Sequence, residues 1–187
     1  MINMEKGCVI WLTGLPGSGK TTIAREAAKR IRDTGRNVEI LDGDEVRKWL
    51  SPEAGFSRED RRRHLRRVAH VARLLAKNGV IVLCSFVSPY EDVRKEVREI
   101  VESENIRFVE VYTKCSLEEC IRRDPKGLYK KALKGEIAMF TGISDIYEEP
   151  QNPELIIDTE KETLDESVEK IVGYLRGNEI IRDTLDL

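Results

Sequence analysis

Short, nearly wholly apolar runs alternate along this chain with longer charged segments of helical period. The apolar runs predict strands over residues 8–13, 38–41, 80–86, 108–113 and 155–157. Strands without polar alternation are typical of the centre of a parallel sheet, which is buried on both faces. The pattern therefore predicts an α/β fold of the three-layer type, with a mostly parallel five-stranded sheet between two layers of helices.

The segments between these runs carry apolar residues three and four positions apart. This spacing predicts helices over residues 21–32, 57–77, 90–102, 117–122 and 164–175. Ser116 is suited to cap the fourth of these helices, and Gly177 to end the fifth. In the second helix one face is expected to join the core: Leu65, Val68, Ala69, Ala72, Leu75 and Ala76.

Residues 124–153 break the alternation. They combine prolines with Lys126, Lys130, Lys131 and Lys134 and give little strand signal. We interpret them as a mobile flap over the site and not as a second domain. Residues 1–187 are thus expected to form one domain, with 177–187 as a C-terminal tail.

Composition narrows the function classes. The chain has 187 residues, 40% of them hydrophobic, and 32 Lys and Arg residues against 34 Asp and Glu residues. With charges this nearly balanced, the chain has no overall positive electrostatic field to attract a polyanion, so nucleic acid is not an expected partner. No apolar run reaches the roughly 18 residues of a membrane helix, and the first residues lack a secretion-signal pattern, so a cytoplasmic protein without a membrane partner is expected. The four cysteines form no C-x-x-C pair and are expected to be buried, reduced thiols.

The strongest motif follows the first predicted strand directly. Residues 14–21 read GLPGSGKT and fit G-x-x-x-x-G-K-[ST] immediately before a helix. In this motif backbone amides and the helix dipole hold phosphates, Lys20 neutralises the β and γ phosphates, and Thr21 ligates Mg²⁺. The sequence therefore predicts that a purine triphosphate with Mg²⁺ binds to these residues: Gly14, Leu15, Pro16, Gly17, Ser18, Gly19, Lys20, Thr21 and Thr22.

A phosphate loop works with an acidic side chain near the bound phosphates, and here the candidates lie at the end of the second predicted strand. The third strand ends in Cys84 and Ser85 and supplies none, and residues 113–116 (TKCS) lack the acid of a guanine reader. Asp42 and Asp44 follow the second strand, and the carboxyl ends of parallel strands face the same site. One of these acids can accept a proton from an attacking hydroxyl or hold magnesium, while Arg47 can bind an anion. An acidic turn that caps a helix is the structural alternative.

An arginine-rich stretch opens the second long helix. Most of its arginines are expected to form a solvated face, but Arg61 follows Phe56 closely and is suited to bind an anion. Phe56 could stack on a base or belong to the core. His64 and His70 have no partners at metal-ligand spacing and are expected to be structural.

Together these segments resemble the adenylylsulfate kinase (APS kinase) family over nearly all of residues 8–175. Besides the generic phosphate loop, the resemblance rests on LDGDEVR (41–47), GFSREDR (55–61), RRVAHVARLLAKNGVIVLCSFVSPY (66–90), EVYTKCSLEECIRRDPKGLYKKA (110–132), GEIAMFTG (135–142) and YEEPQNPELIIDT (147–159). It implies that ATP, with Mg²⁺, phosphorylates the 3′-hydroxyl of adenosine 5′-phosphosulfate (APS) in sulfate activation. The products would be 3′-phosphoadenosine 5′-phosphosulfate and ADP, and the enzyme would be a homodimer.

The resemblance also implies residue roles. Asp42 and Asp44 would lie near the transferred phosphoryl group, with Asp44 as the base or, together with Thr21, as a magnesium-linked acid. Ser85 stands where the family has sometimes been assigned a phosphoserine, but direct in-line transfer needs no covalent step. Further contacts are implied to ATP from Arg122 and Arg123, to the phosphosulfate from Arg47 and Arg61, to adenine from Phe56 and Phe140, and to the substrate from His64, Val87, Ser88 and the flap residue Lys126.

Three positions depart from the family pattern: Thr21 replaces Ser, Ile146 replaces Pro or Asp, and His64 replaces Asn. A histidine with an ordinary pKa near ~6.5 could gain charge beside a bound phosphosulfate. We therefore hypothesise that acceptor affinity improves from about pH 8 to about pH 6.

Two alternatives to this family remain. Another small-molecule or nucleotide kinase of the phosphate-loop class would share Lys20 and the acids, but would not need Phe56, Arg61 and Phe140 together. A sensor that binds ATP without chemistry is the third reading, which the presence of both acids and the arginines disfavours.

Overall fold

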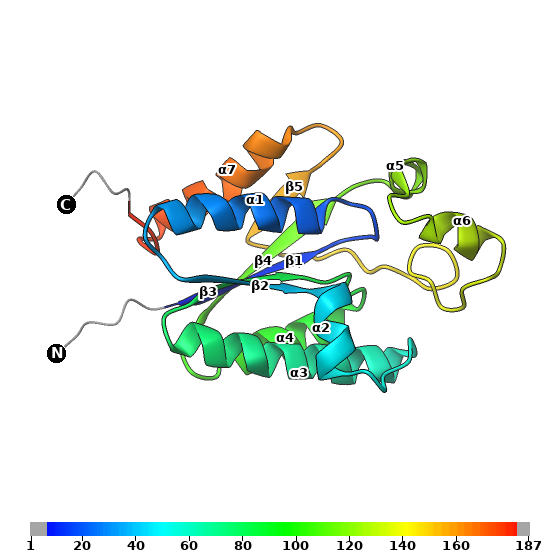
Figure 1. The fold of residues 1–187 in the computed structure, drawn as a ribbon, viewed down its shortest axis with the longest axis horizontal. Coiled ribbons are helices and arrows are strands. Elements are labelled where there is room, and N and C mark those ends of the chain that lie inside the picture. The colour runs from blue at the N-terminus through cyan, green and yellow to red at the C-terminus, as the bar shows by residue number, and fades with distance from the viewer. Residues whose placement is uncertain (1–6, 183–187) are drawn as a thin grey trace.

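Five parallel strands form a single sheet in the computed structural model, which describes residues 7–182. The strands are β1 (Cys8–Thr13), β2 (Val38–Asp42), β3 (Ile81–Ser85), β4 (Arg107–Lys114) and β5 (Leu155–Asp158), in the order β2-β3-β1-β4-β5 (Figure 1). All four strand pairs are parallel, which confirms the predicted class. Because the strands are parallel, the residues that follow β1, β2 and β3 meet at one edge of the sheet.

Helices cover both faces of the sheet. On one face lie α1 (Lys20–Asp33) and α7 (Leu164–Gly177), and on the other lie α3 (Arg58–Lys77) and α4 (Glu91–Glu102) (Figure 1). Successive residues of β1 alternate between the two layers: Ile10 and Leu12 pack into the α1/α7 core, and Val9 and Trp11 into the α3/α4 core. This alternation fixes the direction in which each strand end presents its side chains.

Most element boundaries agree with the sequence to within two residues. Ser116 caps α5 (Leu117–Arg123) by accepting from the backbone amide of Glu119, and α7 ends at Gly177, both as predicted. All four cysteines, Cys8, Cys84, Cys115 and Cys120, are free and buried. Burial raises the pKa of the Cys8 thiol to about 12.

Two short helices were not predicted. The first, α2 (Gly43–Leu50), begins at the Asp-Gly-Asp turn, where the side chain of Asp42 accepts from the backbone amide of Asp44. The acidic cap that the sequence offered as the structural alternative is therefore present, and it is Asp42. The second, α6 (Leu128–Leu133), starts after Gly127, whose φ of +65° suits glycine. Each spans at most eight residues, so the three- and four-residue spacing of apolar positions has little room to recur.

Residues 124–153 pack onto the phosphate loop through a small apolar cluster of their own. Tyr129, Ala132 and Phe140 join Cys115 and Cys120, with Leu15 of the loop against them. The hydroxyl of Tyr129 also donates to the carbonyl oxygen of Pro16 at 2.7 Å. The segment therefore lies over one side of the loop, beyond the strand ends, where Figure 1 shows α5 and α6. In the part of the chain that the structure describes, no helix is long and apolar enough to cross a membrane.

Candidate active site

The phosphate loop turns tightly between β1 and α1. Gly19, the residue before α1, has a φ of +101°, a left-handed conformation that favours glycine. Gly14 is constrained by space instead, because a Cβ there would lie 2.5 Å from the carbonyl oxygen of Thr113 on β4. Glycine at both positions lets the loop close on itself at the start of α1, as the motif predicts.

Lys20 lies inside this loop. Its side chain is buried, and its ammonium donates to the carbonyl oxygens of Gly14 at 2.9 Å and Leu15 at 2.8 Å. The pKa of Lys20 is lowered to about 8, chiefly by burial; Lys126 acts in the same direction as burial, and Cys120 and the two acids of the site oppose it. The loop therefore holds a desolvated cation for which a phosphate anion would be a strong partner.

Asp42, Thr21 and Ser85 form an oxygen cluster beside the loop. Asp42 ends β2 in register with Ser85 of β3. The hydroxyl of Thr21 donates to Asp42 Oδ2 at 2.7 Å and lies 3.2 Å from Ser85 Oγ. The structure thus brings an acid from one strand end to the helix residue of the motif, as the parallel topology requires.

The side chain of Asp44 contacts the flap. It forms an ion pair with Lys126, and both side chains are largely exposed. Lys126 belongs to the turn between α5 and α6, whereas Asp44 lies in the first turn of α2, so the pair spans the mouth of the site. An exposed pair of this kind contributes little stability and can open at low cost.

The donors fit a magnesium ion that arrives with a nucleotide. The ion prefers oxygen ligands and usually takes one or two carboxylates together with substrate phosphates and water. Thr21 and Asp42 supply a hydroxyl and a carboxylate at one point. No group of three or more His, Cys, Asp or Glu side chains that could hold a metal occurs within residues 7–182. The chain therefore provides part of a coordination shell and not a complete cage.

Two guanidinium groups flank the ring of Phe56. The Cζ atoms of Arg47 and Arg61 lie 4.4 and 5.8 Å from its centroid, and the ring is 56% exposed. Burial lowers the pKa of Arg47, and the charge of Arg61 adds to this effect. An exposed ring between two cations offers a surface for a ligand that is both aromatic and anionic.

Arg61 connects this surface to the segment that carries Phe140. Its guanidinium donates to the carbonyl oxygens of Phe56 at 2.9 Å and Met139 at 2.6 Å, and to Thr141 Oγ1 at 3.0 Å. The ring of Phe140 is largely buried and packs edge-on against Tyr129, with 5.0 Å between centroids. The structure therefore brings the two predicted aromatic segments together through Arg61, with Phe56 as the exposed ring.

Of the two arginines predicted to reach ATP, Arg123 is linked to the phosphate loop. It donates to the carbonyl oxygen of Thr159 at 2.9 Å, and the Thr159 hydroxyl donates to the carbonyl oxygen of Ser18 at 3.0 Å. Arg122 is exposed and pairs with Glu119. Sequence reasoning missed Thr159, although its place just after β5, at the same sheet edge, was a usable signal.

Val87 and Ser88 are bound to the sheet. The hydroxyl of Thr13 donates to the carbonyl oxygen of Val87 at 2.8 Å, and the indole nitrogen of Trp11 donates to Ser88 Oγ at 3.1 Å. Ser88 is buried, with a φ of +40°, so its backbone is held in a conformation that serine rarely adopts.

His64 is also buried, and this burial changes the pKa on which the hypothesis of a pH-dependent acceptor affinity depends. Its Nδ1 lies 2.8 Å from Ser51 Oγ, and its ring lies 5.9 Å from that of Phe86. Burial lowers the pKa of His64 to about 4, and the charges of Arg47 and Arg67 add to this effect, against the weaker influence of Glu53. The pKa of His64 in the free enzyme therefore lies well below the unperturbed value near ~6.5, and His64 is neutral between pH 6 and pH 8.

The class of protein follows from three features of the fold and site. A phosphate loop follows β1, an acid ends β2, and helices cover both faces of the sheet, as in a phosphate-loop kinase. Distant neighbours agree on the fold: a gluconokinase from Sinorhizobium meliloti, 15% identical, superposes with a TM-score of 0.58 over 94% of each chain.

Closer comparisons give the family. The adenylylsulphate kinase family model matches residues 6–158. A probable adenylyl-sulfate kinase of Aeropyrum pernix is 60% identical over 93% of this chain and 95% of its own length. An adenylyl-sulfate kinase of Staphylococcus epidermidis is 50% identical over 96% of this chain and 89% of its own length. The structure of Mycobacterium tuberculosis APS kinase CysC in complex with AMPPNP and APS has a TM-score of 0.89 at 40% identity, covering 91% of this chain and 98% of that one. The chain therefore belongs to the adenylylsulphate kinase family, and its activity is the ATP-dependent phosphorylation of an alcohol group of APS.

The buried state of His64 makes a prediction for stability against pH. Because its folded-state pKa lies below the unfolded value, the stabilising contribution is complete above about pH 6.5 and is lost as pH falls toward 4. Between pH 7 and pH 4.5, the wild type should lose about 2 kcal/mol more unfolding free energy than the His64→Asn variant. Urea unfolding at both pH values measures this difference. His70→Asn, at an exposed position, should follow the wild type, and equal losses in all three proteins would contradict the assignment.

Proposed function

We propose that this enzyme transfers the γ-phosphoryl group of ATP directly to the 3′-hydroxyl of APS, with the acceptor on the Phe56 surface. The observation that carries the proposal is the division of the site into two halves. Lys20 and the cluster of Thr21, Asp42 and Ser85 suit a metal-bound triphosphate, while Phe56 between Arg47 and Arg61 suits an aromatic anion. A kinase for a neutral acceptor would not need the second half.

On the ATP side, the loop and Lys20 hold the phosphates. Lys20 exchanges the carbonyl oxygens of Gly14 and Leu15 for phosphate oxygens as the nucleotide enters. Thr21 and Asp42 are the proposed Mg²⁺ ligands of the chain, and the bound ion neutralises charge on the transferred phosphoryl group. Arg123 supports the loop through Thr159 and Ser18.

On the acceptor side, Arg47 and Arg61 bind the phosphosulfate, and Phe56 stacks on adenine. Phe140 closes the other side of the base after a small movement of the 139–141 segment, which Arg61 now holds. Lys126, paired with Asp44 across the mouth, can turn to the entering anions because its ion pair is exposed. The part of residues 124–153 that carries Lys126 and Phe140 then acts as a flap over both substrates, while residues 147–149 stay bonded to the sheet and to loop 86–90.

Asp44 is the proposed base. Its carboxylate accepts the proton of the 3′-hydroxyl as that oxygen attacks the γ-phosphorus and the bond to the β-phosphate oxygen breaks. Asp42 fixes the place of Asp44 by accepting from its backbone amide. Ser85 is buried and bonded to Thr21, which supports a positioning role and not a covalent one.

The acceptor is tested by coupled measurement of ADP release. APS should support turnover, whereas AMP, which has the base and ribose without the sulfate, should support far less because it cannot occupy both arginines. Equal turnover with the two acceptors would contradict the assignment of Arg47 and Arg61.

We also propose that the enzyme is a cytoplasmic homodimer. Assembly varies among relatives: a hexameric APS kinase from Thiobacillus denitrificans superposes with a TM-score of 0.72 at 34% identity, over 96% of this chain and 31% of that one. Light scattering should give twice the chain mass.

The Asp44→Asn variant should lose turnover much more than nucleotide affinity. Proton acceptance acts only in the transition state, and general-base catalysis contributes about 10²- to 10⁴-fold. Steady-state rates together with the dissociation constant of an ATP analogue measure the two effects. Glu45→Gln, on the next residue of α2, is the matched control and should retain both. A parallel loss of turnover and ATP affinity in Asp44→Asn would instead indicate a binding role.

The Phe56→Ala variant should weaken acceptor binding by about 1 to 3 kcal/mol, the range for a base stacked on an aromatic ring. Its Michaelis constant for ATP should not change, because Phe56 is remote from the phosphate loop in the proposed arrangement. Steady-state kinetics with each substrate varied in turn measure the Michaelis constants for APS and ATP separately. Leu74→Ala on α3, at a similarly exposed apolar residue, serves as the control. A rise in the ATP constant alone would mean that the two nucleotide pockets are interchanged.

A further inference from the structure

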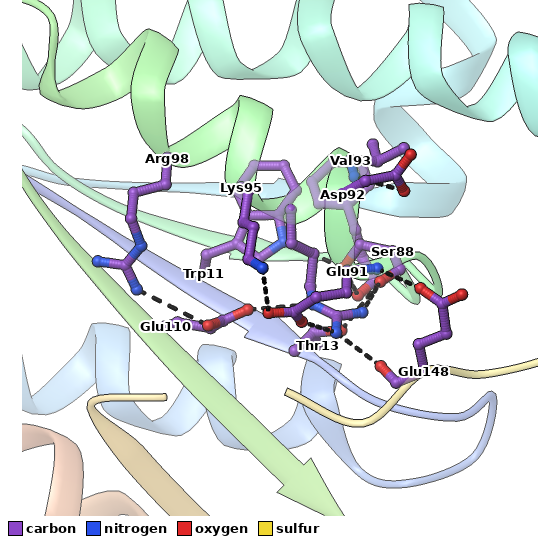
Figure 2. Close-up of polar contacts among 12 residues, drawn as sticks. Trp11, Thr13, Ser88, Glu91, Asp92, Val93, Lys95, Arg98, Glu110 and Glu148 are labelled. Atoms are coloured by element: carbon purple, nitrogen blue, oxygen red, sulfur yellow. Dashed lines mark hydrogen bonds and ion pairs between the residues drawn. The ribbon is translucent and has the colours of Figure 1, made fainter. Parts of the chain in front are cut away.

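A buried guanidinium lies behind the acceptor half of the site, and none of the roles assigned above uses it. Arg94, on α4, is 2% exposed. Figure 2 shows Ser88, Glu91, Glu110 and Glu148 gathered between the sheet and α4, with dashed contacts converging there. A buried cation is costly unless it is paired and hydrogen-bonded, so its partners define what it holds in place.

Two of those partners are backbone oxygens on different loops. Arg94 Nη1 donates to the carbonyl oxygen of Ser88 at 2.7 Å, and Nη2 donates to the carbonyl oxygen of Glu148 at 2.6 Å. The loop 86–90 follows β3, and residues 147–149 end the segment that carries Phe140. Arg94 therefore joins the strand end of the site to the segment that forms the acceptor wall.

Two carboxylates balance the charge of Arg94. Glu91 Oε2 lies 2.5 Å from Nη2, and Glu110 Oε1 on β4 lies 3.1 Å from Nε. Glu110 is buried as well, and its pKa is raised by that burial against the lowering influence of Arg94 and Arg98. The guanidinium thus reaches both loops while its charge stays compensated.

Further bonds connect the same two loops. The backbone amide of Glu148 donates to the carbonyl oxygen of Pro89 at 2.8 Å, and the backbone amide of Glu91 donates to Glu148 Oε2 at 2.7 Å. The hydroxyl of Tyr147 lies 2.9 Å from Thr13 Oγ1 at the end of β1. Residues 147–149 are therefore bonded to the sheet and to loop 86–90 at several points, and both Arg94 and Thr13 are buried.

From these loops the connection continues to Arg61. The hydroxyl of Tyr90 donates to Asp145 Oδ2 at 2.5 Å, and Asp145 Oδ2 lies 4.0 Å from Nη2 of Arg61. Tyr90 also caps α4, the helix that carries Arg94. A displacement of loop 86–90 against residues 145–149 would consequently move the carboxylate beside Arg61.

We propose that Arg94 is a positioning residue for the acceptor: by binding the carbonyl oxygens of Ser88 and Glu148 together, it pre-orders the segment 139–149 and, through Tyr90 and Asp145, the guanidinium of Arg61. The proposal rests on the proposed function, in which Arg61 and the 139–141 segment hold APS. It requires a planar donor with two reachable nitrogens, which arginine provides and lysine does not. Arg94 does not touch the phosphate loop, so ATP binding is independent of it.

The test compares Arg94→Lys with Arg98→Lys. Arg98 lies one turn further along α4 and pairs with Glu154 and Glu110, so its variant perturbs the same charge cluster without touching either loop. Arg94→Lys keeps a cation for Glu110 but cannot bridge the two carbonyl oxygens with the same geometry. We expect its Michaelis constant for APS to rise about 10-fold or more, while the constant for ATP stays within about twofold. In Arg98→Lys both constants should remain near the wild-type values.

A purely structural role would lower thermal stability and impair both substrates alike. Equal increases in the two constants, or an unchanged APS constant in a folded Arg94→Lys protein, would therefore overturn the proposal. Tyr90→Phe provides a second route if Arg94→Lys does not fold, because it removes the bond to Asp145 through which the proposal reaches Arg61, without uncovering a buried charge. The Michaelis constant for APS should rise selectively in this variant, by less than in Arg94→Lys, and an unchanged APS constant would overturn the proposal as well. Absence of APS-dependent ADP release by the wild type would instead refute the proposed function itself.

Discussion

The buried ammonium of Lys20 is the constraint on which the site depends. A cation in a closed loop needs partners, and in this structure the carbonyl oxygens of Gly14 and Leu15 provide them. The loop can close around it because Gly14 allows β4 to approach and Gly19 adopts a left-handed conformation. A triphosphate replaces neutral oxygens with charged ones, so a phosphate anion is a stronger partner for this ammonium than the loop carbonyls are.

The position of the oxygen cluster beside the loop depends on the direction of the strands. Parallel pairing puts the ends of β2 and β3 in register, so Asp42 and Ser85 meet Thr21 at the start of α1. The same edge carries the turn into α2 and the loop 86–90. The acceptor surface is then assembled from segments far apart in sequence, since Arg61 of α3 bonds to residues 139 and 141. Ordering those segments requires buried polar contacts, and the network around Arg94 supplies several of them.

The sequence predicted what depends on local pattern. The five strands, the phosphate loop and the acids after β2 are contiguous motifs with a fixed structural context, and the structure has each of them near the expected place. It could not predict α2 and α6, which are too short to show a period, or the burial of His64, which depends on packing against Ser51 and Phe86. Arg94 was unremarked for the same reason: on its helix it looks like any surface arginine, and only the fold puts it between two loops and two acids.

The central claim is that the Lys20 ammonium is held ready for phosphate, and the pKa of this one side chain tests it most directly. Nuclear magnetic resonance of lysine labelled with ¹³C at Cε, with the Lys20→Arg variant for assignment, can follow the titration with and without a non-hydrolysable ATP analogue. The account predicts a pKa of about 8 in the free enzyme, because of burial, and a clearly higher value in the complex, because bound phosphate favours the charged form. The same pKa in both states would contradict it.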